Sequence, residues 1–385
     1  MDISYIINEL GEEREQYFNA VAPPIIQSSN FACSTVAEMR HKMQHEVDEY
    51  MYSRGNNPTV TILEKKLAAL EGAEHALAFG SGIAAVSAAV LSQVKAGDHV
   101  VCVRHPYSWT NKLLHEFLLR FGVTTTFVDG TDAGNYRQAI RPNTTVLYLE
   151  SPNSFTFELQ DIAAVVAIAK EHGCTTIIDN SFASPLYQQP IKLGVDLVVH
   201  SCTKYIGGHS DVMGGVVCGA RASINKIFRQ EYMTLGAVLA PHAAWLLLRG
   251  LRTLPLRMAR VAATARQVVD YLVQHPKVER VLFPFLPSHP QYELARKQMH
   301  NNSGQFSILL QTTEPTKVDL FCDSLKRFLM AASWGGHESL IFPVSATYTS
   351  DTMKTDLPVN LIRFYVGLEE PEYLIQDIEH ALAKL

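Results

Sequence analysis

Between Pro58 and Gly236, short apolar runs alternate with longer segments in which apolar residues recur at helical spacing. Short apolar runs bounded by glycine and polar residues are typical of buried strands. Strands are predicted at His99–Val103, Thr124–Val128, Val146–Leu149, Thr175–Asp179, Asp196–His200 and Gly214–Cys218. Helices are predicted at Pro58–Gly72, Ile83–Val94, Asn111–Phe121, Asp161–His172 and Ala222–Tyr232.

This alternation predicts an α/β fold in which helices cover both faces of a largely parallel sheet. In such sheets, ligands bind at the carboxyl ends of the strands. After Gly236 the pattern changes to a long, arginine-rich helix at Ala243–Gln274, followed by the strands and helices of a second, smaller unit. The predicted organisation is an N-terminal arm (1–50) with a helix near Val36–Val47, a larger domain (51–240) and a C-terminal domain (241–385).

Candidate chemistry gathers where the strand at Asp196–His200 ends. Lys204 follows this strand, and the chain then becomes rich in glycine and polar residues. Burial and neighbouring cations can lower the pKa of such a lysine from about 10.4, which makes it a better nucleophile. Ser201 and Thr203 add two hydroxyls that can donate hydrogen bonds to a phosphate.

A second strand, Thr175–Asp179, ends in a carboxylate. An acid at one strand end and a lysine with hydroxyls at another form the arrangement that pyridoxal phosphate (PLP) needs, because the lysine forms a Schiff base with the cofactor and the carboxylate pairs with its pyridine nitrogen. Taken singly, Lys204 could be a surface residue and Asp179 could cap a turn. The complete pattern favours a PLP site.

A glycine-bearing turn opens into an alanine-rich helix in the segment Phe79–Val90. Backbone amides at the start of a helix bind phosphate groups, and the helix dipole adds to this attraction. On its own the segment could be an ordinary turn. Beside the Lys204 segment it is predicted to form the phosphate cradle, with Ser81, Gly82 and Ile83 in contact with the cofactor.

Composition narrows the class of protein further. A chain of 385 residues with 47% hydrophobic and 18% charged residues is typical of a soluble globular protein, and a net charge of -5 does not favour nucleic-acid binding. The six cysteines lack CxxC spacing, the N-terminus lacks signal-peptide features, and no apolar run approaches the length of a membrane span. We therefore expect a reduced, cytoplasmic protein. His209 has no partners at metal-binding spacing and no nucleophile elbow is present, so neither a metal site nor a hydrolase is expected.

Motifs along nearly the whole chain resemble one family. YSRGNNPT (Tyr52–Thr59), the Lys204 segment and LIRFYVGLE (Leu361–Glu369) resemble the cysteine/methionine-metabolism group of PLP enzymes, which includes cystathionine γ-synthase, cystathionine β- and γ-lyases and methionine γ-lyase. The resemblance implies an aspartate-aminotransferase-like (type I PLP) fold, with a mostly parallel seven-stranded sheet and a smaller α+β C-terminal domain. It also implies PLP as cofactor and a sulfur-containing amino acid as substrate.

The resemblance also implies shared active sites. In the family, side chains at the positions of Tyr52 and Arg54 reach the cofactor phosphate of a neighbouring subunit. The forked guanidinium of arginine suits this role because it binds phosphate oxygens in pairs. We therefore expect an obligate dimer, assembled further into a homotetramer as a dimer of dimers.

Further residues acquire roles from the resemblance. Tyr107 in HPYSWT is expected to stack on the cofactor ring and to take part in proton transfer, although the family more often has Tyr-Gly-Gly-Thr at this place. Arg363 is expected to bind the α-carboxylate of the substrate. Ser333 and Trp334 match positions that shape the same pocket.

Three segments favour one reaction within the family. ESPNSFTFELQDI has Ser154 and Phe155 where γ-synthases and γ-lyases typically have asparagine and proline, and KYIGGHSD and SWGGHESLI are also similar to β-lyases, whereas YSRGNNPT is closer to the γ-enzymes. The prediction is a cystathionine β-lyase-like enzyme of trans-sulfuration that converts L-cystathionine to homocysteine, pyruvate and ammonia. The alternatives are γ-elimination or γ-replacement, and a PLP-binding regulatory protein that catalyses no reaction.

Overall fold

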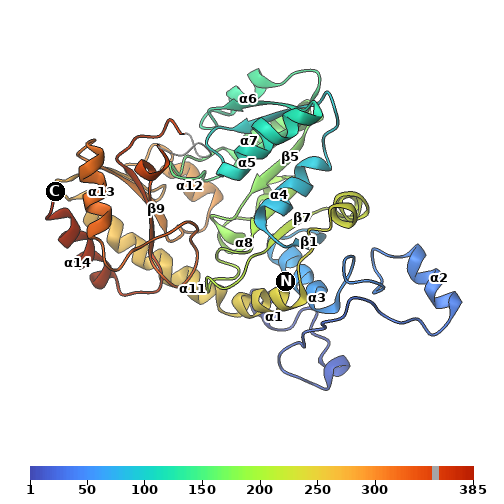
Figure 1. Ribbon diagram of the computed structural model, residues 1–385. Helices are drawn as coiled ribbons and strands as arrows, with labels where there is room; N and C mark the ends of the chain where they lie inside the picture. Colours follow the sequence, from blue (N-terminus) through green and yellow to red (C-terminus); the bar gives the residue numbers. More distant parts are fainter. Residues whose placement is uncertain (349–354) are drawn as a thin grey trace.

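The computed structural model, which describes residues 1–348 and 355–385, contains two β-sheets connected by the long helix α11 (Pro241–Val273) (Figure 1). The larger sheet has seven strands and lies in the first two thirds of the chain, and the smaller sheet has five strands and lies near the C-terminus. The predicted α/β fold with a mostly parallel seven-stranded sheet is therefore confirmed. No described helix combines the length and apolarity needed to cross a bilayer.

The strand order of the larger sheet is β1-β7-β6-β5-β4-β2-β3. Only β7 runs against its neighbours, so β6 and β7 form an antiparallel pair and the loop between them carries Lys204. The remaining ladders are parallel, which places the ends of β4, β5 and β6 at the same edge of the sheet. The strands are β1 (His75–Phe79), β2 (His99–Val103), β3 (Thr124–Val128), β4 (Thr144–Glu150), β5 (Thr175–Asp179), β6 (Leu197–Ser201) and β7 (Gly215–Gly219).

Helices pack on this sheet and bury its apolar strands. Helix α4 lies against β6 and β7, α7 lies against β4 and β5, and α3 contacts β1 and β7. The boundaries of α3 follow from its sequence, because Asn57 caps the first turn, Pro58 occupies the first position and Gly72 ends the helix with a left-handed backbone (φ 78°). The helices of this part are α3 (Pro58–Glu71), α4 (Gly82–Leu91), α5 (Ser108–Lys112), α6 (Ala133–Ala139), α7 (Ile162–Glu171), α8 (Ser184–Tyr187), α9 (Arg221–Ile227) and α10 (Met233–Leu235).

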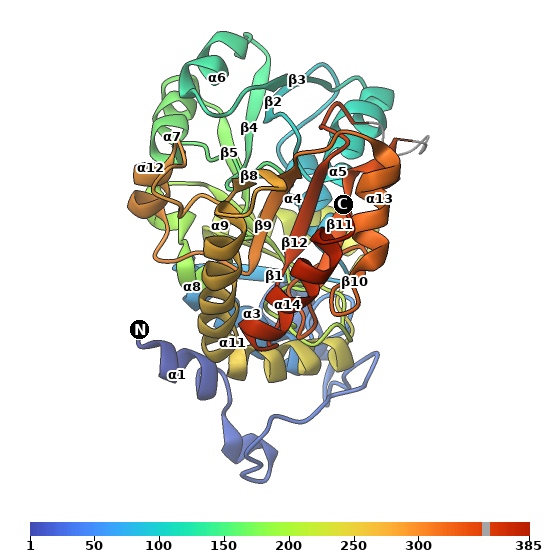
Figure 2. The same cartoon turned by 90° about the vertical axis from the view of Figure 1, so that its left-hand side faces the viewer.

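The smaller sheet has the order β10-β11-β12-β9-β8 and is antiparallel except for the β10–β11 pair (Figure 2). Helix α11 serves both cores, because Leu247 and Leu251 pack in the larger core whereas Val268 and Leu272 pack in the smaller one. The elements of this part are β8 (Val278–Leu282), α12 (Tyr292–Gln298), β9 (Gln305–Leu310), α13 (Pro315–Ser324), β10 (Leu329–Met330), β11 (Leu340–Pro343), β12 (Leu361–Tyr365) and α14 (Pro371–Leu382). The domain borders near residues 50 and 240 stay predictions.

The N-terminal segment is only partly an arm. A short helix α1 (Ile3–Asn8) packs on the body through Ile6 and Ile7, whose carbonyls accept hydrogen bonds from the buried Lys66 amine at 2.8 and 3.0 Å. Helix α2 (Val36–Gln44) has no buried residue, and the chain around it extends away from the sheets (Figure 1). The segment thus begins with a helix that packs on the body, and the N-terminal arm over residues 1–50 stays a prediction.

Other differences from the predicted elements lie at boundaries and in short elements. Helix α4 ends at Leu91 rather than Val94, and the helix expected at Asn111–Phe121 begins at Ser108 and passes through a π-helical turn (Leu113–Phe117). A second π-turn follows α9 at Phe228–Tyr232. Strand β1 and helices α6 and α12 were not predicted, because short apolar runs beside turns do not distinguish a strand or a single helical turn from a loop.

The buried carboxyl of Glu64 on α3 generates a stability prediction. Its Oε1 accepts a hydrogen bond from the Ala78 amide at 2.8 Å, and burial raises its pKa to about 8 despite this bond. The folded protein thus holds a proton that the unfolded chain releases near pH 4.5, so stability falls as the pH rises from about 4.5 to 8. Glu64→Gln keeps a side-chain oxygen that can accept the hydrogen bond from the Ala78 amide, and it removes the loss of stability at high pH because glutamine does not titrate. We expect thermal unfolding to show the variant a few degrees more stable than wild type at pH 8.5 and nearly equal at pH 5; an equal difference at both values would contradict the assignment.

Candidate active site

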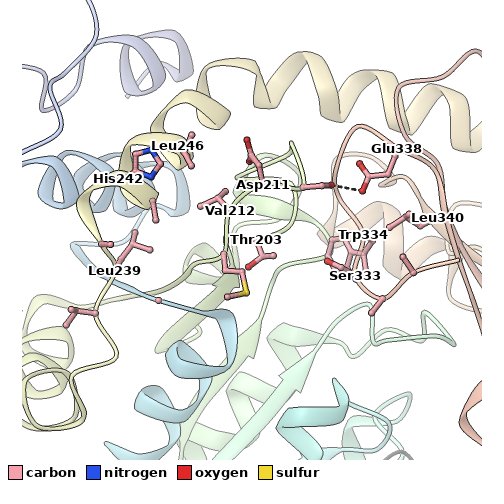
Figure 3. Close-up of a pocket in the computed structure, with 18 residues that line it drawn as sticks. Thr203, Asp211, Val212, Leu239, His242, Leu246, Ser333, Trp334, Glu338 and Leu340 are labelled. Atoms are coloured by element: carbon pink, nitrogen blue, oxygen red, sulfur yellow. Dashed lines mark hydrogen bonds between the residues drawn. The ribbon is translucent and has the colours of Figure 1, made fainter. Parts of the chain in front are cut away.

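Lys204 lies in the first turn after β6, and its side chain is directed toward the C-terminal part of the protein. The amine Nζ donates a hydrogen bond to the Ser333 hydroxyl and lies 5.3 Å from the centre of the Trp334 ring. Figure 3 shows Ser333 and Trp334 near Thr203. The structure therefore brings together three residues that were predicted from segments far apart in the sequence.

The backbone around Lys204 is fixed from two sides. The buried Arg257 guanidinium on α11 donates to the carbonyls of Tyr205 and Gly250, both at 2.7 Å. Gly250 is needed for this packing, because a Cβ there would lie 2.3 Å from the Ile206 carbonyl oxygen. On the other side Gly335 (φ 90°) lies against Lys204, where a Cβ would come within 2.8 Å of its backbone. The position of the lysine thus depends on helix α11 and on the loop between β10 and β11.

Arg363 on β12 is the second cation of the site. Its Nη2 donates to the backbone carbonyl of Ser333 at 3.4 Å, while the hydroxyl of the same serine accepts the hydrogen bond from Lys204. One residue therefore separates an amine from a guanidinium. A carboxylate bound at Arg363 would therefore hold the rest of an α-amino acid on the side of Ser333 where the Lys204 amine lies.

The two cations influence each other. Burial and the positive charge of Arg363 lower the pKa of Lys204 to about 8, and Asp179 opposes this shift. Burial also lowers the pKa of Arg363 to about 10, so the guanidinium stays charged at neutral pH. The uncharged fraction of Lys204 near neutrality is therefore larger than that of an ordinary lysine, which favours a role as nucleophile or general base.

Asp179 stands at the end of β5, beside β6. Its Oδ1 accepts hydrogen bonds from the amide and hydroxyl of Ser181 at 2.9 and 2.6 Å, and the Ser181 hydroxyl in turn accepts one from the Ser201 amide at 2.7 Å. Burial raises the pKa of Asp179 against these bonds. A cation beside this carboxylate, such as a protonated pyridine nitrogen, would offset the cost of burying its charge.

Glu150, which the sequence analysis missed, lies directly beside Asp179, since the two residues are register partners on β4 and β5. One oxygen of its carboxylate accepts from the Tyr107 amide at 2.7 Å, and the other accepts from the amide and hydroxyl of Ser154 at 2.8 and 2.7 Å. Burial and the charge of Asp179 raise its pKa to about 7. The sequence did contain a signal for Glu150, because this acid directly follows the predicted strand Val146–Leu149, which precedes the Asp179 strand in the chain.

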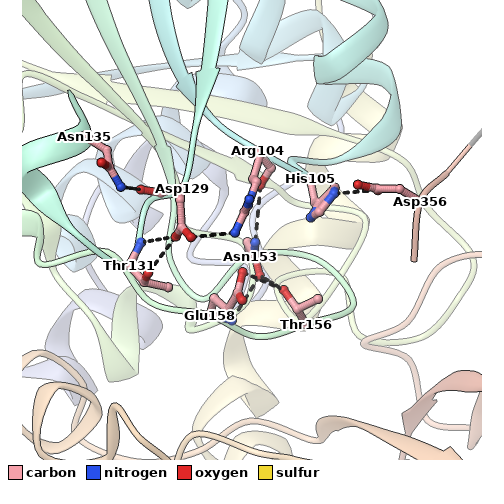
Figure 4. Close-up of polar contacts among 9 residues, drawn as sticks. All are labelled: Arg104, His105, Asp129, Thr131, Asn135, Asn153, Thr156, Glu158 and Asp356. Atoms are coloured by element: carbon pink, nitrogen blue, oxygen red, sulfur yellow. Dashed lines mark hydrogen bonds and ion pairs between the residues drawn. The ribbon is translucent and has the colours of Figure 1, made fainter. Parts of the chain in front are cut away.

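Tyr107 lies in a loop after β2 and is 40% exposed. Burial of part of the ring, with the nearby Asp179 and Glu150, raises the pKa of its hydroxyl. The loop is held at its start, because His105 Nε2 lies 2.7 Å from Asp356 in the C-terminal part and Arg104 pairs with Asp129 at 2.5 Å (Figure 4). Tyr107 is therefore placed at the open side of the site, where a cofactor ring could contact it.

The predicted phosphate cradle adjoins the strand that leads to Lys204. Ser81 caps α4, its hydroxyl accepting from the Ala84 amide at 3.2 Å, and the first-turn amides of Gly82 and Ile83 precede the helix's own hydrogen-bond pattern. A Cβ at Gly82 would lie 2.8 Å from the Ser201 side chain, so the helix start and the strand end are in close contact. This edge of the sheet therefore offers a partner for each group of PLP. The amides and the serine hydroxyl fit the phosphate, Lys204 fits the aldehyde, and Asp179 fits the pyridine nitrogen.

Tyr52 and Arg54 are not brought to this edge. Their side chains lie beside each other, with the guanidinium 5.5 Å from the tyrosine ring, and the Tyr52 backbone pairs with Asn30. Along residues 1–348 and 355–385, no hydrogen bond or ion pair connects either side chain to Lys204.

Beside the site lies a pocket of about 770 Å³, whose walls include Thr203, Ser333 and Trp334.

The sheet arrangement and the lysine–aspartate pair at adjoining strand ends define a PLP-dependent enzyme of the type I fold. Comparison with known proteins identifies the particular family. The chain belongs to the Cys/Met metabolism PLP-dependent enzymes, whose family model matches residues 5–383. PLP is therefore its cofactor.

Similar proteins act on sulfur amino acids. An L-methionine gamma-lyase of Treponema denticola is 40% identical over 376 residues, covering 96% of this chain and 94% of the relative. A cystathionine gamma-lyase of Bacillus subtilis is 38% identical over 371 residues (95% of both chains), and a probable cystathionine gamma-synthase of Herpetosiphon aurantiacus is 43% identical over 301 residues (78% and 92%). The crystal structure of metB from Corynebacterium glutamicum superposes with a TM-score of 0.93 at 34% identity, covering 100% of this chain and 98% of that one.

The lowered pKa of Lys204 generates a prediction for cofactor uptake. Only the uncharged amine reacts with an aldehyde, so the rate at which the apoprotein captures PLP should rise with pH around a midpoint near 8. Arg363→Met removes one of the charges that lower this pKa, and we expect the midpoint to move to higher pH. Stopped-flow absorbance measures the rate, and Lys204→Arg reports the background from other lysines. An unchanged midpoint in the Arg363 variant would show that the two cations do not interact.

Proposed function

We propose that this enzyme cleaves the γ-carbon–sulfur bond of a sulfur-containing α-amino acid, methionine or cystathionine, and with the uptake of water releases a thiol, 2-oxobutyrate and ammonia. The observation that carries the proposal is the pair of contacts at Ser333, which accepts hydrogen bonds from Lys204 and from Arg363. This arrangement supports a substrate with neighbouring amino and carboxylate groups. The relatives named for methionine and cystathionine γ-chemistry support the position of the bond that breaks.

Each charged residue has a proposed task. Arg363 binds the α-carboxylate and fixes the orientation of the Cα–H bond, and Lys204 removes the Cα proton once its amine is free. Asp179 keeps a proton on the pyridine nitrogen, and Ser81, Gly82, Ile83, Ser201 and Thr203 hold the phosphate. PLP, when bound, would accept the electrons released at Cα, and loss of a thiolate from Cγ additionally requires removal of a proton from Cβ. Tyr107 stacks on the ring and takes part in proton transfer.

A second candidate is α,β-elimination of cystathionine, which the sequence analysis preferred. Trp334 beside the Lys204 amine and Ser154 on Glu150 are the observations that favour it, because these residues shape the pocket in a way that resembles β-lyases. The comparisons support γ-chemistry more strongly, since the relatives described above are γ-lyases and a probable γ-synthase. We therefore rank γ-elimination first.

We further propose a dimer in which each arm completes the site of the other subunit, and a dimer of dimers as the full assembly. Tyr52 and Arg54 make no hydrogen bond or ion pair with Lys204 in the described chain, and none of the residues assigned to the phosphate cradle (Ser81, Gly82, Ile83, Ser201 and Thr203) carries a positive charge. The pocket beside Ser333 also presents the exposed apolar side chain of Met213. An arm from a second copy would cover this residue and bring Arg54 to the phosphate.

Product analysis tests the reaction. Incubated with L-methionine or L-cystathionine, the purified enzyme should form 2-oxobutyrate, identified by chromatography of the keto-acid. Pyruvate from cystathionine would instead establish β-elimination, and the absence of any keto-acid would favour a regulatory protein. Lys204→Ala is the control, and we expect its turnover to fall by about 100-fold or more, because the general base is lost.

Subunit mixing tests the shared site. Arg54→Ala and Lys204→Ala should each be inactive, but a mixed dimer contains one site with an intact Lys204 and an intact partner Arg54. We expect mixing to recover activity, up to about a quarter of the wild-type value when subunits exchange at random. Exchange is verified by mass spectrometry of tagged subunits, and verified exchange without recovery would contradict the proposal.

A further inference from the structure

The guanidinium of Arg363 lies in an aromatic corner formed by Phe155 and Phe342. Its central carbon is 4.9 Å from the Phe155 ring centre and 5.3 Å from that of Phe342, and the two rings meet edge-to-face at 5.5 Å. Phe342 is the register partner of Arg363 on β11, whereas Phe155 comes from the loop after β4 in the other half of the chain. The corner thus spans both halves of the protein.

The backbone that presents Phe155 is strained and held in place. Phe155 has φ 64°, in the left-handed region that is unfavourable for a residue other than glycine. The preceding residue, Ser154, is fixed by the two hydrogen bonds that it donates to Glu150. On the other side, Asn153 closes the loop by accepting hydrogen bonds from the Thr156 hydroxyl at 2.8 Å and the Glu158 amide at 3.0 Å.

Aromatic rings position a guanidinium without neutralising it. A carboxylate partner would compete with the carboxylate of a substrate, whereas the electron-rich faces of two rings attract the cation and leave its N–H groups free. Within the described residues, Arg363 has no salt-bridge partner, and it donates a long hydrogen bond of 3.4 Å to the Ser333 carbonyl. The side of the guanidinium that faces Ser333, and hence Lys204, is the side available to an anion.

We propose that Phe155 is a positioning residue for the carboxylate-binding arginine: its ring, with that of Phe342, holds the Arg363 guanidinium in the orientation that receives the α-carboxylate of an amino acid. The inference rests on the proposed function, because it deepens the role given there to Arg363. It also assigns a function to Glu150, whose contacts with Ser154 hold the Phe155 loop in place.

The same loop supplies a matched control. Phe157 also has a positive φ of 53°, but its ring packs against Phe182 at 5.4 Å, and no cation–π contact with Arg363 is found for it. Phe155→Leu and Phe157→Leu therefore each remove a phenyl ring from the same strained loop. Only Phe155→Leu removes a ring that contacts Arg363. Phe155→Tyr keeps the ring face and serves as the conservative variant.

The experiment compares two ligands of the PLP-loaded enzyme that lack a sulfur leaving group: L-norleucine, which has the carboxylate, and pentylamine, which does not. Dissociation constants come from the change in visible absorbance of the bound cofactor. We expect Phe155→Leu to weaken norleucine binding by about threefold to tenfold and to leave pentylamine binding within about twofold, because a cation–π contact contributes that much. Phe157→Leu should change both ligands by the same factor, and Phe155→Tyr should resemble wild type.

The outcomes separate the two proposals. If Arg363→Ala leaves the preference for norleucine over pentylamine unchanged, the carboxylate role of Arg363 fails and the inference fails with it. If Arg363→Ala abolishes the preference but Phe155→Leu behaves like Phe157→Leu, only the role of Phe155 is overturned. Should Phe155→Leu fail to fold, Phe342→Leu removes the other ring of the corner, and an unchanged preference in that variant overturns the inference.

Discussion

The site depends on holding two cations, Lys204 and Arg363, on either side of one serine in a poorly solvated place. Like charges repel more strongly as water is removed, so this arrangement persists only because other groups offset the repulsion. Glu150 and Asp179 supply two carboxylates nearby, and Lys204 gives up part of its charge through its lowered pKa. A reactive amine at neutral pH is thus a consequence of the electrostatic balance, as is a guanidinium ready to bind an anion.

This balance requires both halves of the chain. Lys204, Asp179 and Glu150 come from the larger sheet, whereas Ser333 and Arg363 come from segments that follow α11. Helix α11 joins them physically, because Arg257 binds the loop of Lys204 and later turns of the same helix lie in the smaller core. A change in the relative position of the two sheets would therefore alter the spacing of the two cations directly.

Much of the larger sheet could be predicted from the sequence. The strands at His99–Val103, Thr124–Val128 and Thr175–Asp179 have the predicted bounds, and the first of them is the fully buried apolar run typical of a central parallel strand. Parallel topology places strand ends at one edge, which is the reason that the sequence pairs Asp179 with Lys204, and the roles of these two residues stay predictions. The family and its cofactor, inferred from motifs, are confirmed.

What could not be predicted depends on contacts between distant segments. The partnership of Phe155 with Arg363 crosses from one half of the chain to the other, and no local pattern marks it. The π-turn at Leu113–Phe117 carries no sequence signal of its own, and α1 was missed because its burial arises from packing on α3 rather than from a long periodic pattern. The preference for β-elimination rested on a few loop residues, which report pocket shape but do not by themselves decide which bond breaks.

The left-handed backbone at Phe155 and Ser333 has a consequence for engineering this enzyme. Each of these conformations costs of order 1–3 kcal/mol that glycine at the same position would avoid. Glycine, however, has neither a ring to place against Arg363 nor a hydroxyl to place against Lys204. Substituting glycine at either position to gain thermal stability would therefore remove a contact of one of the two cations.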